Sequence, residues 1–167
     1  MSEAEKKEIA QRLTTRVSTG VLFVELNYLD RHSTPDAAWI RNIYILLSFY
    51  TELLLKAIFT IKGNFVDVAN LDERLRKMGH NLETIGKEIG SLELLSFGIK
   101  NIKYLNPKDG YIVETETGCF YVQDFNEIRY DFMDSRVRTL DGSEHDMFRK
   151  QIGIMIAINR KLKPLVW

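Results

Sequence analysis

Apolar residues recur at helical spacing through most of the chain. Residues 3–30 carry apolar side chains three or four positions apart, a pattern typical of an amphipathic helix, although Gly20 weakens it locally. A second helix is predicted over residues 35–62. Pro35 suits its first position and Gly63 is a natural end.

This second helix is apolar on nearly every face. A helix of that kind is surrounded by other elements of the protein. We therefore expect it to be the central helix of a bundle, or to line an oligomer interface as well. Its apolar residues are Ile40, Ile43, Tyr44, Leu46, Leu47, Phe49, Tyr50, Leu53, Leu54, Leu55, Ile58 and Phe59.

The rest of the chain predicts further helices and one hairpin. Two runs rich in β-formers, separated by Glu116-Thr117-Gly118, are typical of a small β-hairpin near residues 106–123. The last helix follows at 143–162. Between the central helix and the hairpin, helices are predicted over residues 71–78, 80–90 and 91–104.

Together these elements predict a mainly all-α fold. The expected architecture is an up-and-down bundle of four to five helices with the small hairpin inserted. A chain of 167 residues fits one domain, so we expect residues 1–167 to form a single helical unit.

Charge and cysteine content narrow the function classes. The chain has 23 basic and 23 acidic residues, so no global field attracts nucleic acid or an anionic membrane, and such binding would need a local patch. Cys119 is the single cysteine, which excludes an intrachain disulfide and favours a cytoplasmic location. Glu52 and Lys56 interrupt the most apolar stretch, so we expect no membrane span.

No strong chemical motif is present. The sequence lacks a glycine-rich phosphate loop, paired cysteines and a His-Glu-x-x-His segment. His32, His80 and His145 lie far apart in the sequence and show no ligand spacing, so no metal site and no cofactor are predicted. Cys119 has no evident activating neighbour, and a structural thiol is favoured over a nucleophile.

Glu52 and Lys56 are the first candidate site. They lie four residues apart in the order that favours an ion pair on a helix, and their neighbours are apolar. A buried charge is costly unless it is paired and hydrogen-bonded. The pair therefore either fixes the helix structurally, which we favour, or faces a cleft and orients a ligand.

His80 and Arg129-Tyr130 are the second and third candidates. His80 begins a predicted helix, where its imidazole either ties the turn to the central helix or serves a ligand. Arg129 next to Tyr130 can grip a phosphate or stack on a base. Alternatively, Arg129 supplies a counter-charge to Glu52 and Tyr130 packs in the core.

In this order, the three candidates resemble the HEPN domains, a family named for higher eukaryote and prokaryote nucleotide-binding proteins. Glu52-Leu-Leu-Leu-Lys56 resembles the Glu-x-x-x-Lys pattern of the family's central helix, and His80-Asn-Leu82 resembles its His-x-Leu helix start. Arg129-Tyr130 resembles the Arg-Tyr pair before its last helix. The resemblance covers about residues 36–160.

The resemblance implies a helical bundle, often dimeric. Family roles include RNA cleavage, RNA or nucleotide binding, and scaffolding beside a nucleotidyltransferase partner. This chain departs from the family in its inserted hairpin. It also departs after Arg129-Tyr130, where it has Asp131-Phe132 and many relatives have Pro-Asp.

The ribonuclease branch of the family implies an Arg-x(4–6)-His signature. Arg74 with His80 and Arg138 with His145 both match its spacing, at a frequency little above chance. Metal-independent cleavage needs an acid–base histidine near an arginine that stabilises phosphate charge. If the chain is an enzyme, the candidate catalytic residues are Arg138 and His145.

The sequence as a whole therefore predicts a non-catalytic, HEPN-like module that binds a nucleotide, RNA or a partner protein, as a homodimer in the cytoplasm. A nucleotidyltransferase is the partner that the resemblance implies. The first alternative is a metal-independent ribonuclease toxin or defence effector. The second is a protein–protein interaction module that uses the apolar central helix and takes no small ligand.

Overall fold

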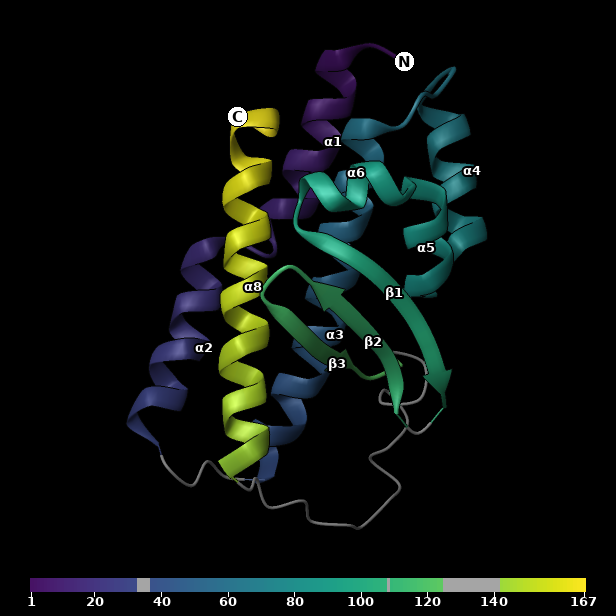
Figure 1. The fold of residues 1–167 in the computed structure, drawn as a ribbon. Coiled ribbons are helices and arrows are strands. Elements are labelled where there is room, and N and C mark those ends of the chain that lie inside the picture. The colour runs from purple at the N-terminus through teal and green to yellow at the C-terminus, as the bar shows by residue number, and fades with distance from the viewer. Residues whose placement is uncertain (33–36, 108, 125–141) are drawn as a thin grey trace.

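The computed structural model describes residues 1–32, 37–107, 109–124 and 142–167 (Figure 1). The described part is mainly helical and contains a small three-stranded antiparallel sheet. The predicted all-α class and the hairpin are thus confirmed at this level of detail. Figure 1 shows the two chain termini at the same end of the molecule.

The first helical segment of the sequence is two helices rather than one. α1 spans Glu3–Thr15 and α2 spans Thr19–Arg31. The chain breaks between them because the Ser18 side chain accepts a hydrogen bond from the Val21 backbone N–H, which starts a new helix. Val17 lies between the two helices and is buried, so the apolar spacing of the sequence continues through the break.

α3 spans Ala37–Lys62 and is the core helix, as its all-round apolar pattern predicted. It packs against α1, α5 and α8, and it also contacts the sheet. Among the described residues, one stretch, Asn42–Lys62, is long and apolar enough to cross a membrane. Because 67% of its most apolar part is buried inside the protein, it fits the core helix of a soluble protein.

Three short helices follow, and polar side chains start the first two. α4 spans Val68–Met78, α5 spans Leu82–Ile89 and α6 spans Ser91–Ser96. Asp67 and Asn81 accept hydrogen bonds from backbone N–H groups in the first turns of α4 and α5. Gly79 ends α4 and the Asn81 cap starts α5, so His80 lies in the short turn between these two helix ends.

The sheet contains a strand that the sequence pattern misassigned. β1 spans Ile99–Asn106, β2 spans Gly110–Thr115 and β3 spans Gly118–Val122, in the order β1-β2-β3. The prediction of a helix over 91–104 was therefore wrong beyond Ser96.

A bulge in β1 explains the error. Between Ile99 and Asn101 the strand advances two residues while its partner β2 advances one, so Lys100 is the extra residue. Ile99 and Ile102 are both buried and lie three positions apart instead of two. That spacing is the helical one, although the backbone is extended.

The sheet has one buried and one open face. Its inner face carries Tyr111, Val113, Phe120 and Val122, which are at most 2% exposed. β3 contacts α3 and α8, and β1 contacts α5 and α6. Figure 1 shows the sheet lying across α3 with its other face turned to the viewer.

α8 spans Gly142–Val166 and closes the core. It packs along α2, where Arg149 Nη2 lies 2.6 Å from Asp30 Oδ1, and along α3 and α1. The Asn159 side chain donates to the backbone carbonyl of Val17 at the break between α1 and α2. Side chains from the first helix to the last thus share one hydrophobic cluster.

Two adjacent residues of β3 test the assignment of the two faces. Phe120 is 1% exposed and Tyr121 is 47% exposed. We expect Phe120→Ala to lower the free energy of unfolding by about 3–5 kcal/mol, because it leaves a cavity in the core. Tyr121→Ala should cost less than about 1 kcal/mol, the range of a cross-strand pair. Chemical denaturation measures both, and equal losses would contradict the assignment.

Candidate functional site

The predicted polar cluster forms around the Glu52 carboxylate. Glu52 lies in the middle of α3 with its side chain only 3% exposed. Lys56, one turn later, places its Nζ 2.6 Å from Glu52 Oε1, and its side chain is 14% exposed. The helix spacing that suggested the pair therefore brings the two charges together inside the protein.

His80 completes the cluster from another element. Its Nδ1 lies 2.7 Å from Glu52 Oε2, and its side chain is 37% exposed. The ring reaches α3 because the chain turns sharply between α4 and α5, where Gly79 has a φ of +56° that other residues rarely adopt. We name Glu52, Lys56 and His80 the carboxylate clamp.

The clamp satisfies the buried carboxylate on both sides. One oxygen accepts from the Lys56 ammonium and the other faces the imidazole. A buried carboxylate needs such partners, because an ionised group costs far more to remove from water than a neutral polar group does. The carboxylate thus holds His80 in place and joins the start of α5 to α3.

The remaining predicted site residues divide into two groups. Arg129, Tyr130 and Arg138 lie outside the described residues, and so does the expected contact of Arg129 with Glu52. His145 lies within α8, but its side chain is not among those described.

The other ribonuclease-like match, Arg74 with His80, is occupied by separate partners. Arg74 Nη2 lies 2.5 Å from Glu88 Oε2, and its guanidinium lies 4.9 Å from the centre of the Phe59 ring. His80 is instead bound to Glu52. Arg74 therefore connects α4 to α5 through its ion pair and to the core through a cation–π contact, which is a structural role.

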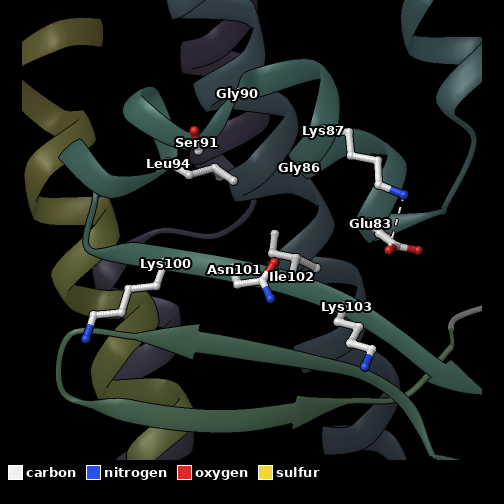
Figure 2. Close-up of a pocket in the computed structure, with 10 residues that line it drawn as sticks. All are labelled: Glu83, Gly86, Lys87, Gly90, Ser91, Leu94, Lys100, Asn101, Ile102 and Lys103. Carbon is white, nitrogen blue, oxygen red and sulfur yellow. Dashed lines mark ion pairs between the residues drawn. The ribbon is translucent and has the colours of Figure 1, made fainter.

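A groove lies next to α5, with α5 and α6 forming one wall and β1 forming the other (Figure 2). Its volume is about 410 Å³. Gly86 gives the close contact of helix and strand, since a Cβ there would lie 3.2 Å from Ile102 Cδ1. The lining residues are Glu83, Gly86, Lys87, Gly90, Ser91, Leu94, Lys100, Asn101, Ile102 and Lys103.

Three lysines surround this groove. Lys87 Nζ is paired with Glu83 Oε1 at 3.2 Å. In the described part of the chain, Lys100 and Lys103 have no carboxylate within ion-pair distance. Figure 2 shows both side chains extending from β1 on the side away from α5 and α6. Lys100 and Lys103 thus line the groove from β1, and their ammonium groups place positive charge beside it, although the whole chain is neutral.

The groove and the clamp are connected through α5. The clamp fixes the start of α5, and the outer side of the same eight-residue helix forms one wall of the groove. The sequence pattern did not indicate this groove, because it placed Lys100 and Lys103 on a helix. A weak signal was present in the sequence, where Lys100 follows Ile99 and Lys103 follows Ile102.

Other chemistry is sparse in the described residues. They contain no group of three or more His, Cys, Asp or Glu side chains arranged to hold a metal ion. Cys119 is a free, exposed thiol on β3. Burial raises the pKa of the Tyr111 phenol, with the nearby Asp124 carboxylate as a second cause, so this inward-facing tyrosine stays neutral.

Removal of the carboxylate tests the clamp. We expect Glu52→Ala to lower the free energy of unfolding by about 3–5 kcal/mol, because it leaves the Lys56 ammonium, whose side chain is 14% exposed, without its partner. Denaturant titration measures the change.

The matched control is Glu73→Ala. Glu73 and Lys77 have the same spacing, but their side chains are 61% and 72% exposed. This control should leave the denaturation midpoint unchanged, because an exposed pair is screened by water. A Glu52→Ala midpoint equal to that of the control would rule out a structural clamp.

Comparison with known proteins does not assign the chain to a group. No family model matches it, and neither a curated protein nor a solved structure shows significant similarity to it.

Proposed function

We propose that this chain is a non-catalytic binding module for a phosphate-bearing ligand, RNA or a nucleotide, which it takes in the groove between α5, α6 and β1. The observation that carries the proposal is the positive charge of Lys100 and Lys103 at a groove of ligand size. Small-molecule pockets span roughly 300–1,000 Å³, and this groove falls within that range.

The lysines have the chemistry that a phosphate needs. An ammonium group donates up to three hydrogen bonds and acts as a compact point charge. Asn101, between them on β1, adds an amide that can both donate and accept. Since the chain has no net charge, this local patch is what would attract an anion.

A second explanation exists for lysines on β1. This strand is at the edge of the sheet, and charged side chains on an edge prevent pairing with another chain. In that case, replacing the lysines would promote aggregation and leave ligand binding unchanged. We favour a ligand because the same lysines line a groove rather than a flat edge.

The absence of catalysis is also part of the proposal. The HEPN-like order of Glu52, Lys56 and His80 supports a bundle of that type. Both oxygens of Glu52 are engaged in the clamp, and Arg74 is engaged with Glu88. We further propose that the module is cytoplasmic and forms a homodimer, and that its partner is a nucleotidyltransferase, as the resemblance implies.

The salt dependence of RNA binding tests the groove. Each lysine that neutralises a phosphate of a single strand contributes about −0.7 to the slope of log K against log salt concentration. We expect the double variant Lys100→Gln/Lys103→Gln to reduce that slope by about 1.4. Fluorescence anisotropy with a labelled RNA oligomer measures it.

Lys7→Gln is the control, because Lys7 is an exposed lysine on α1, away from the groove. Its slope should equal that of the unmodified protein. No binding of RNA or of a nucleotide panel by the unmodified protein at low salt would refute the proposed function.

One arrangement favours the ribonuclease alternative. A half-exposed histidine whose Nδ1 faces a buried carboxylate is oriented as a general base would be. We nevertheless expect RNA incubated with the protein in the presence of a chelator to stay intact on a gel. Cleavage that His80→Ala abolishes would replace the binding module with a metal-independent ribonuclease.

A further inference from the structure

The outer face of the sheet is open and carries an exposed aromatic ring. Tyr121 is 47% exposed, whereas its neighbours Phe120 and Val122 are each 1% exposed, so the strand alternates strictly. In Figure 1 no labelled helix crosses the sheet face that is turned to the viewer. Tyr121 therefore offers its ring to solvent from a rigid strand.

The strand register aligns this ring with a lysine of the groove. Tyr121 pairs with Ile112 on β2, and Ile112 pairs with Lys103 on β1. Neighbouring strands lie about 4.8 Å apart, so Tyr121 and Lys103 are roughly 10 Å apart across the sheet. An aromatic ring, a half-buried apolar side chain and a cation thus form one cross-strand row.

The next row limits where an anion can lie. Asn101, Glu114 and Cys119 share that register, and the Glu114 carboxylate repels phosphate. Positive charge on this face is therefore concentrated along β1, at Lys103 and at the bulged Lys100. The side chains of both lysines extend from β1 on the side away from α5 and α6 (Figure 2).

We propose that this face binds single-stranded RNA, with one base stacked on Tyr121 and the adjoining backbone phosphates held by Lys103 and Lys100. The inference rests on the proposed function, and it names the class of ligand and adds a contact outside the groove. The bound RNA passes from the open face of the sheet to the groove, because Lys100 and Lys103 belong to both surfaces.

Stacking explains why the ligand is single-stranded. A ring on a flat sheet can receive the face of a base only when that base is unstacked from its own strand. Positive charge beside such a ring holds the backbone without reading the base sequence. The simpler explanation of Tyr121, a strand-forming residue that packs on Ile112, requires no ligand and no dependence on bases.

The experiment separates stacking from charge. A labelled uridine oligomer and a ribose–phosphate oligomer of equal length without bases are titrated against the protein by fluorescence anisotropy. We expect Tyr121→Leu to weaken binding of the uridine oligomer by about 5-fold to 150-fold and to leave binding of the abasic oligomer unchanged. Tyr121→Phe should retain the affinity of the unmodified protein, because it retains the ring.

Two further variants serve as controls. Tyr121→Ile is a second non-aromatic change that suits a strand, and it should behave as Tyr121→Leu does. Phe23→Leu alters another exposed aromatic residue, on α2, and should change neither affinity.

The outcomes distinguish this inference from the proposed function. Equal effects of both non-aromatic variants on the two oligomers, or no effect on either, overturn stacking on Tyr121. If binding then still depends on Lys100 and Lys103, the groove remains and only this inference fails. If the unmodified protein binds neither oligomer and no member of a nucleotide panel, the proposed function fails with it.

Discussion

The Glu52 carboxylate is a charged group in the middle of the core helix, and the protein could not bury it alone. Placing it in the middle of the core helix obliges the fold to bring cations or hydrogen-bond donors to both of its oxygens. Lys56 comes from the same helix, but His80 must come from elsewhere in the chain. The contact of His80 with Glu52 therefore helps to fix the turn between α4 and α5, together with the buried side chains of Met78 and Leu82 on either side of it.

This requirement extends to the surface. Because the start of α5 is fixed to α3, the helix presents Gly86 to Ile102 of β1, and the contact seats the sheet against the helices. At the other edge of the sheet, the Ser48 hydroxyl donates to the carbonyl of Gln123, 2.7 Å away. The sheet is thus held at both edges, by α5 and α6 along β1 and by α3 next to β3.

Parts of the fold that depend on interactions between sequence neighbours were predictable, and parts that depend on contacts between distant residues were not. Most helices and the hairpin depend on local spacing and caps, so they could be predicted from the sequence, although the break between α1 and α2 was not predicted. The members of the clamp were predicted as candidates, because Glu52 and Lys56 are one turn apart in an apolar helix and His80 begins the next predicted helix but one. The groove and β1 were not foreseen, because the bulge at Lys100 gives a strand the apolar spacing of a helix, and only pairing with β2 resolves the ambiguity. Arg129, Tyr130 and Arg138 lie outside the described residues.

The same bulge makes the number of residues in β1 as important as their identity. Substitution of Lys100 alters a charge, but loss of one residue there would remove the irregularity that lets Ile99 and Ile102 face inward together. Every side chain on one side of the deletion would then exchange faces with its neighbours. Relatives of this protein should therefore seldom carry an insertion or a deletion at this point.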